Sequence, residues 1–322
     1  MKKITGWHHI TSIASDAQKN YEFMTQVLGL RLLKKTVNQD DVTAYHTFFG
    51  DENASAGNDL TYFDFPGIPK AVRGTNAITS IGLRVPSDAA LDYWFKRLEE
   101  FKVKHHDIDE LFGVKGLRFE DHDGLRYRLV SDENGAGGTA PGTPNQWSDV
   151  PDEFAIIGIG TIEITVRHLE GQESWLIDTL GFRRIGEEEG AIRYETGDGG
   201  NSSSIHVRVD QKSQNEYQGY GSVHHIALRI PDHAELMKRI EHVNSLYYPN
   251  SGFVTRFYFE SLYTRVDSIL YEFATDVPGF TVDEPLATLG ESLSLPPFLE
   301  GNREEIERTI RPFDTTRINY RK

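Results

Sequence analysis

The sequence SVHHIALRI at residues 222–230 is the stretch on which the fold depends. Its aliphatic and β-branched residues predict a strand, and the strand carries two adjacent histidines, His224 and His225. A near-copy, GWHHITSIA, occupies residues 6–14. Two such strands far apart in one chain indicate an internal repeat, which has to be traced before the fold can be assigned.

Side chains alternate between the two faces of a strand, so each histidine pair is expected to present one ring to each face. In the second strand, His224 shares its face with the apolar residues at 226, 228 and 230, whereas His225 lies on the other face. The same alternation places His9 on the cavity side and His8 on the packed side. We therefore expect His9 and His225 to face one metal, and His8 and His224 to point away from it.

The composition is that of a folded, acidic protein. Of 322 residues, 38% are hydrophobic and 26% are charged, and the net charge of −15 argues against nucleic acid or an anionic membrane as the main partner. There is no cysteine, so disulfides, thiolate nucleophiles and iron–sulfur clusters are excluded, and any metal needs nitrogen and oxygen ligands. No apolar run approaches the roughly 20 residues of a membrane span, and the N-terminus lacks the apolar core of a signal peptide. We expect a cytoplasmic protein.

Four modules of the chain share one plan, a strand followed by a helix and two or three further strands. They open near residues 8, 79, 158 and 223, and their helices are expected over 17–28, 89–101, 172–180 and 233–243. Further strands are expected over 44–49, 60–65, 117–120, 125–130, 191–196, 203–209, 255–259, 261–266 and 269–275. A Gly- and Pro-rich stretch between the second and third modules is typical of a linker. The sequence therefore predicts an α+β fold with halves over 1–133 and 154–277, a linker over 134–153 and a C-terminal helical tail over 278–322.

The two halves match each other in short motifs. LGLR at 28–31 matches LGFR at 180–183 with an offset of 152 residues, and LRVP at 83–86 matches LRIP at 228–231 with an offset of 145 residues. The glycine in the first pair of motifs is typical of a left-handed cap at the end of a helix. The chain is therefore expected to be an internal duplication.

The duplication separates residues needed for the fold from residues needed for chemistry. Across the two offsets, His225 falls opposite Ser80 and His9 falls opposite Thr161. Such a strand can evidently be built without histidine, which favours a functional role for this pair. We expect modules one and four to line one metal-holding cup, and modules two and three to form a metal-free partner.

The third ligand is expected to be a carboxylate on a neighbouring strand. Glu272 lies in the otherwise apolar run ILYEFA at 269–274, where an unpaired carboxylate would be costly. Its counterpart in module two is Arg128. Two histidines and one carboxylate form the facial triad of non-haem iron(II) oxygenases. Manganese, nickel or zinc also fits such nitrogen and oxygen ligands, and the sequence does not discriminate among them.

Further motifs carry a resemblance to a known family. They are HHIT at 8–11, LGLRL at 28–32, KKTVN at 34–38, TAYH at 43–46, GDE at 50–52, VHHIA at 223–227, Arg256, EFATD at 272–276, PGF at 278–280 and LPPFLE at 295–300. Together they resemble the vicinal oxygen chelate (VOC) superfamily of glyoxalases, fosfomycin-resistance proteins and extradiol dioxygenases. The closer resemblance is to its ring-cleaving dioxygenases that act on hydroquinones. One departure is the turn at 266–268, which is about one residue shorter than in that family.

The resemblance implies a fold, a site and an activity. The fold would be four βαβββ modules that form two half-barrel domains. His9, His225 and Glu272 would hold Fe(II), and the groups that contact substrate or support the ligands would be Thr11, His224, Arg256 and Tyr263. The implied activity is ring cleavage of a hydroquinone or catechol by a non-haem dioxygenase that inserts both atoms of O2. The partners would then be a small aromatic diol and O2, with a homo-oligomer left open.

Two other functions stay open at this point. One is a glyoxalase-type isomerase or thiol transferase on the same scaffold, although module one offers only Asp64 as a second carboxylate on its matching strand. The other is a binding protein that has lost catalysis. Among the remaining histidines, His46 lies between aromatic residues and is expected to be a core histidine, and His105 and His106 are expected to be solvated before an acidic loop.

Overall fold

The computed structural model describes residues 1–321 and confirms an α+β chain of four modules and a tail with a short helix. Modules one and two comprise β1 (Trp7–Ile13), α1 (Ala17–Glu22), β2 (Arg31–Val37), β3 (Tyr45–Gly50), β4 (Asp59–Phe63), β5 (Ala77–Val85), α2 (Asp88–Glu100), β6 (Lys104–Leu111), β7 (Val114–Glu120) and β8 (Arg126–Ser131). Modules three and four comprise β9 (Ile162–Val166), α3 (Leu169–Ser174), β10 (Arg183–Glu188), β11 (Ala191–Glu195), β12 (Ser204–Val209), β13 (Ser222–Ile230), α4 (His233–Ser245), β14 (Val254–Thr255), β15 (Phe259–Val266) and β16 (Ile269–Pro278). The tail adds α5 (Arg303–Thr309). Within the described range, every helix is too short or too polar to cross a bilayer.

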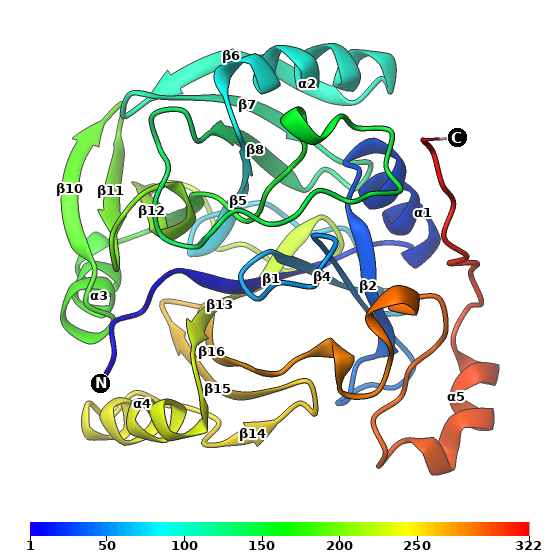
Figure 1. Ribbon diagram of the computed structural model, residues 1–322. Coiled ribbons are helices and arrows are strands. Elements are labelled where there is room, and N and C mark those ends of the chain that lie inside the picture. The colour runs from blue at the N-terminus through cyan, green and yellow to red at the C-terminus, as the bar shows by residue number, and fades with distance from the viewer. Residues whose placement is uncertain (322) are drawn as a thin grey trace.

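The strands form two curled eight-stranded sheets (Figure 1). The order β14-β15-β16-β13-β1-β4-β3-β2 joins modules one and four, and the order β10-β11-β12-β9-β5-β8-β7-β6 joins modules two and three. The modules meet at the antiparallel pairs β1–β13 and β5–β9. The predicted pairing of the modules is therefore confirmed. The half boundaries, 1–133 and 154–277, stay a prediction, since each sheet draws strands from both halves.

Local backbone features repeat at the offsets seen in the sequence. A π-helical turn over Phe23–Val27 follows α1, and another over Trp175–Thr179 follows α3. Gly29 and Gly181 come next with φ angles of 71° and 77°, the left-handed conformation that favours glycine at a helix end. The predicted caps are confirmed, and with them the equivalence of modules one and three.

Three strands of the structure, β2, β6 and β10, are missing from the predicted set. All three lie at sheet edges, and charged residues interrupt their apolar pattern, as in RRIGEE of β10. Edge strands commonly carry charge, which prevents further pairing, so their alternation is weak. The predicted acidic loop after His105 and His106 is wrong, because both residues and the acidic residues that follow them lie within β6. The charge on this edge strand hid its alternation.

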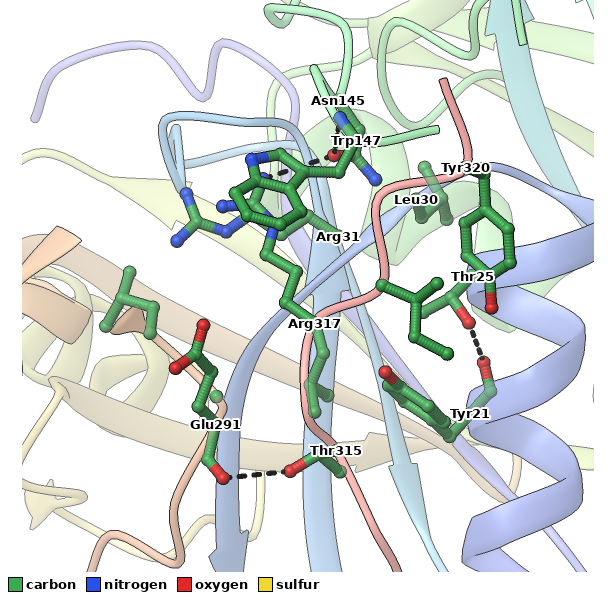
Figure 2. A pocket seen from close by; sticks show the side chains of 14 residues that line it. Tyr21, Thr25, Leu30, Arg31, Asn145, Trp147, Glu291, Thr315, Arg317 and Tyr320 are labelled. Atoms are coloured by element: carbon green, nitrogen blue, oxygen red, sulfur yellow. Dashed lines mark hydrogen bonds between the residues drawn. The ribbon is translucent and has the colours of Figure 1, made fainter. Parts of the chain in front are cut away.

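The C-terminal tail packs along module one and the linker (Figure 2). The guanidinium of Arg317 lies 4.5 Å from the Trp147 ring centre and bonds the Glu52 carboxylate at 2.6 Å. Thr315 donates a hydrogen bond to the carbonyl of Glu291 at 3.1 Å. The cavity beside these groups measures about 30 Å³, which has room for no more than a few water molecules. The tail therefore fastens the linker to module one without forming an organic ligand site there.

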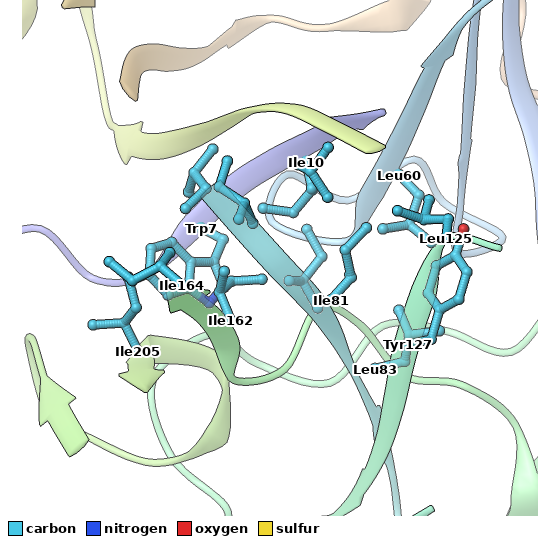
Figure 3. Close-up of a cluster of buried hydrophobic side chains, with 14 of the residues drawn as sticks. Trp7, Ile10, Leu60, Ile81, Leu83, Leu125, Tyr127, Ile162, Ile164 and Ile205 are labelled. Carbon is cyan, nitrogen blue, oxygen red and sulfur yellow. The ribbon is translucent and has the colours of Figure 1, made fainter. Parts of the chain in front are cut away.

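The main apolar core combines side chains of both sheets (Figure 3). Trp7 and Ile10 of β1 enter it from the first sheet, and Ile81 of β5 and Ile164 of β9 enter it from the second. The Trp7 indole also donates a hydrogen bond to the carbonyl of Gly160 at 3.0 Å. Burial of such side chains stabilises the fold by about 25 cal/mol per Å² of apolar surface. One face of each strand is used for this core, which leaves the other face free to line a cup.

We expect Ile164→Ala to lower the free energy of unfolding by about 2–5 kcal/mol, because the change removes methyl groups from a packed core and leaves a cavity. Ile164 is 0% exposed, and Ile185, at 50% exposed, provides a matched control. Ile185→Ala should change the free energy by less than about 0.5 kcal/mol. Urea unfolding followed by circular dichroism measures both, and similar losses in the two variants would contradict the assignment of the core.

Candidate metal centre and its cavity

Neighbouring strands at the centre of the first sheet bring the three predicted ligands together. β16, β13 and β1 are consecutive in the sheet and carry Glu272, His225 and His9. Thr11 lies opposite His225 across β1–β13, and Ala227 lies beside Glu272 across β13–β16. All three candidate ligands are buried. The pairing of modules one and four therefore assembles the site from residues more than 200 positions apart.

The ligand atoms converge on one point. His9 Nε2 lies 3.2 Å from His225 Nε2 and 3.1 Å from Glu272 Oε2, and His225 Nε2 lies 2.8 Å from the same oxygen. Metal–nitrogen bonds of about 2.1 Å at right angles place neighbouring ligand atoms about 3 Å apart. Over residues 1–321, this is the one group of three such side chains close enough to share an ion. The residues present fit a metal ion.

His8 determines which nitrogen of His9 faces this point. His8 Nε2 lies 3.1 Å from the carbonyl oxygen of Thr275, which can only accept, so this nitrogen carries the hydrogen. Burial, together with the neighbouring His9, lowers the pKa of His8 to about 3, so the ring is neutral at pH 7. Its Nδ1 then accepts a hydrogen bond from His9 Nδ1 at 2.8 Å. His9 Nε2 is left with a free lone pair, as a metal ligand requires.

His224 and His225 repeat the contact between two Nδ1 atoms that His8 and His9 make, but no backbone carbonyl within residues 1–321 fixes the outer ring as Thr275 does for His8. His224 Nδ1 and His225 Nδ1 lie 2.8 Å apart. Burial and the neighbouring His225 lower the pKa of His224 to about 3. His224 is also part of the cavity wall. One residue of each pair therefore meets the other ligands, and its neighbour orients it.

The expectation that His8 and His224 point away from the site fails for His224, which lines the cavity, whereas His8 lies behind His9 and contacts the Thr275 carbonyl. The β1–β13 register skips His8 on one strand and His224 on the other, which makes each a β-bulge. A bulge adds one unpaired residue and re-aims the side chains around it, so strict alternation fails there. The β5–β9 pair skips Thr79, the counterpart of His224, so the distortion belongs to the repeated module and is present without histidine.

Glu272 is a buried carboxylate whose surroundings favour the ionised form. Burial by itself would raise the pKa of Glu272, but the facing imidazoles of His9 and His225 outweigh it and hold this pKa well below its usual range. Ser261 donates a hydrogen bond to Oε1 at 2.5 Å, whereas Oε2 is buried and faces the His9 and His225 nitrogens, at 3.1 and 2.8 Å. A buried oxygen of this kind requires compensation, and a cation between the two imidazoles would supply it.

The three ligands open onto a cavity of about 350 Å³. Its apolar wall is formed by Phe48, Phe63, Phe65, Phe259 and Leu270. Polar groups come from the first sheet, from the loop at 38–41 and from the segment before β15. A cavity with mostly flat apolar walls and a few converging polar groups suits a small aromatic ligand.

Three of the four predicted supporting residues line this cavity, and two of them, Arg256 and Tyr263, are hydrogen-bonded to each other. Arg256 donates from Nε to the Tyr263 hydroxyl at 3.2 Å and forms two bonds to the Asp40 carboxylate at 2.9 and 3.1 Å. Burial and the Glu272 charge raise the pKa of Tyr263, so its phenol stays protonated. Arg256 thus supplies the positive charge and Tyr263 a hydroxyl near the ligands.

Of the other two predicted supporting residues, Thr11 lies within the sheet and His224 lies in the cavity wall. Thr11 is fully buried, and its hydroxyl lies 2.9 Å from His225 Nε2 and 2.7 Å from the Thr61 hydroxyl. It therefore contacts a ligand from within the sheet. His224 lies in the cavity wall, with the Phe63 ring 5.5 Å away and edge-on, where it can meet a bound molecule.

Sequence reasoning missed the wall that β2 and β3 contribute. His46 is not simply a core histidine, since it lines the cavity between the rings of Phe48 and Phe63, at 4.0 and 4.4 Å. Burial and the nearby His9 and His225 hold the pKa of His46 well below its usual range. The signal available in the sequence was a histidine flanked by aromatic residues, which does not distinguish a core from a cavity wall.

The chain is similar to known proteins along most of its length. The model of the Glyoxalase/Bleomycin resistance protein/Dioxygenase superfamily matches residues 6–129. The "Putative ring-cleaving dioxygenase MhqA" of Bacillus subtilis (strain 168) is 45% identical over 316 residues, which cover 96% of this chain and 99% of that protein. The chlorohydroquinone/hydroquinone 1,2-dioxygenase of Sphingobium indicum is 30% identical over 322 residues, which cover 96% of this chain and 97% of that protein.

Solved structures agree with the sequence relatives. The crystal structure of a "putative dioxygenase from Bacillus subtilis" has a TM-score of 0.89 and 34% identity, and the match covers 99% of this chain and 100% of that one. Glyoxalase I from Zea mays has a TM-score of 0.59 at 13% identity, over 84% of this chain and 92% of that one, which is a likeness of fold alone. The resemblance inferred from the motifs is confirmed: this chain belongs to the Glyoxalase/Bleomycin resistance protein/Dioxygenase superfamily.

Proposed function

We propose that this protein is a non-haem Fe(II)-dependent dioxygenase that opens the ring of a hydroquinone- or catechol-type aromatic and inserts both atoms of O2. The observation that carries the proposal is the convergence of His9, His225 and Glu272 at an aromatic-walled cavity. Two histidines and one carboxylate are the ligand set of non-haem iron oxygenases, and the set leaves coordination positions open. The 30% identical Sphingobium relative is named for action on hydroquinones, which supports the same substrate class.

The chain's own residues support this chemistry in distinct ways. An iron(II) ion bound here would supply the redox chemistry that joins O2 to an activated ring. The aromatic side chains of the cavity wall, among them Phe48 and Phe63, can pack against a flat substrate. With His225 Nδ1 donating to His224 Nδ1, the neutral His224 ring carries its hydrogen on Nε2, so in the cavity wall it can donate a hydrogen bond to an oxygen atom of a bound diol. The guanidinium of Arg256 can stabilise negative charge that develops nearby.

The cavity also favours substrates without a formal negative charge. Its rim carries Asp40 and Asp41, and Asp40 already pairs with Arg256. A carboxylate on the ring would therefore meet the like charges of Asp40 and Asp41. Neutral diols meet no such repulsion.

We expect Glu272→Gln and His225→Ala to lose bound iron. The amide removes the anionic ligand while keeping its shape, and the alanine removes a nitrogen ligand. His106→Ala, on the exposed face of β6, serves as the matched control. Metal analysis after anaerobic iron loading and gel filtration should find close to one ion per chain in the wild type and the control. Equal retention in all four proteins would contradict the site.

We expect His8→Phe to weaken iron binding about 10- to 100-fold, the usual cost of removing a group that orients a metal ligand. Phenylalanine cannot accept from His9 Nδ1, so the His9 ring loses its preference for the tautomer with a free Nε2. Competition with a chromophoric chelator measures the affinity directly. An unchanged affinity, in a variant that melts like the wild type without metal, would show that the tautomer is not set by His8.

The activity itself is tested by loading the protein with iron(II) under nitrogen and adding hydroquinone and then O2. We expect one O2 consumed per ring opened, and with isotopically labelled O2 both atoms should appear in the product by mass spectrometry. Glu272→Gln should show no uptake above background. Isomerisation of a glutathione hemithioacetal without oxygen uptake would instead favour a glyoxalase-type enzyme and overturn the proposal.

A further inference from the structure

The wall formed by β2 and β3 carries two polar side chains that the proposed chemistry does not use. Thr36 of β2 and His46 of β3 lie directly opposite each other in the register of the two strands. Side chains at such positions are close neighbours on one face of a sheet. Both line the 350 Å³ cavity that contains His9, His225 and Glu272.

The Thr36 hydroxyl is buried without a partner. The residue is 1% exposed, and its Oγ1 has no hydrogen bond within the protein. Buried hydroxyls in folded proteins nearly always have a partner, because leaving one unpaired costs free energy. The next residue, Val37, packs in a separate apolar cluster with Tyr45, so the position of Thr36 on the cavity face is set by the strand. Because Thr36 lines the cavity, a turn of its side chain would bring this hydroxyl to a molecule held there, which can supply the missing partner.

His46 connects this wall to the metal centre through hydroxyl groups. Its Nε2 lies 3.1 Å from the Thr61 hydroxyl, which lies 2.7 Å from the Thr11 hydroxyl. Thr11 in turn lies 2.9 Å from His225 Nε2. The contact with Thr61 uses Nε2, so a ligand in the cavity would meet the other edge of the ring. Thr36 and His46 therefore form a polar patch on β2 and β3, which β4 separates from β1 and its candidate ligand His9.

The positions of the two hydroxyls on a diol determine whether the molecule can reach this patch. An ortho-diol carries both hydroxyls at one end of the ring, so both lie at the metal centre when one of them binds there. A para-diol carries its second hydroxyl at the far end of the ring, where aromatic walls alone would leave it unpaired. An enzyme site that bonds such a hydroxyl discriminates strongly against molecules without it.

We propose that Thr36, with His46 beside it, binds the distal hydroxyl of a para-diol and so makes the cavity selective for hydroquinones over catechols. The inference rests on the proposed function, because it takes the other hydroxyl to be held at His9, His225 and Glu272. Thr36 and His46 act as specificity-determining residues that touch the substrate away from the reacting carbons.

The test compares Thr36→Val with the wild type. Valine keeps the shape of threonine and removes the hydroxyl, and Thr36→Ser restores a hydroxyl. Thr75→Val is the matched control, since Thr75 is equally buried and its Oγ1 is likewise unpartnered, but it lies outside the cavity. Dissociation constants for hydroquinone, catechol and phenol are measured on the iron-loaded proteins under nitrogen, and oxygen uptake is measured separately.

We expect Thr36→Val to raise the dissociation constant of hydroquinone about 3- to 10-fold, the effect of one neutral hydrogen bond. The constants for catechol and phenol should stay within about twofold of the wild type, because neither presents a hydroxyl to this wall. Thr36→Ser should recover most of the loss, and Thr75→Val should match the wild type for every ligand. His46→Phe, which keeps an aromatic ring between Phe48 and Phe63, should also weaken hydroquinone selectively.

The outcomes separate this inference from the proposed function. If Thr36→Val changes the dissociation constants of all three ligands equally, or changes none of them, the proposed role of Thr36 is wrong. A wild type that does not bind hydroquinone would also overturn it. Selective loss of hydroquinone binding together with absent oxygen uptake in the wild type would support the distal contact and overturn the dioxygenase. A melting temperature of Thr36→Val close to that of Thr75→Val shows that any selective loss is not a folding defect.

Discussion

The antiparallel pairing of β1 with β13 is the contact on which the site depends. It joins module one to module four, makes one sheet of them, and places His9 and His225 across a single strand boundary. Backbone hydrogen bonds of a ladder are specific in register, and a slip of one residue would turn every side chain to the other face. The centre is therefore built by a long-range pairing, and Glu272 joins it through the parallel contact of β16 with β13.

The identity of the ligands was predictable from the sequence because it follows from local alternation and from comparison of the repeats. His9, His225 and Glu272 stand out against Thr161, Ser80 and Arg128 at equivalent places, and the structure brings the three together. The orientation of His8 and His224 was not predictable in this way. A bulge is a property of two paired strands, and neither strand of the β1–β13 pair shows in its own sequence where the register skips.

The far wall of the cavity was missed for a related reason. β2 lies at a sheet edge, where charge on Lys34 and Lys35 interrupts the apolar pattern, although the strand is buried throughout. Lys34 is compensated by Asp283 of the tail, at 2.7 Å, which no local pattern indicates. Since β2 was not recognised, neither Thr36 nor the cavity face of His46 could be placed. This wall of the cavity therefore depends on contacts between residues that are distant in the sequence, which local patterns do not predict.

The second sheet shows the same architecture without the three candidate ligands. At the place of Glu272 it has Arg128, whose guanidinium bonds the Asp109 carboxylate at 2.6 and 3.1 Å and lies against Gly116, where a Cβ would approach it within 2.4 Å. A cation that belongs to the chain thus takes the central position, and its charge is balanced by Asp109 on β6, the second strand along from β8 in the sheet. This cup keeps the same strand order and the same bulge, at Thr79, without any of the three ligands. The repeated architecture is therefore complete without a metal ligand set, because the shared core and the paired strands hold the fold.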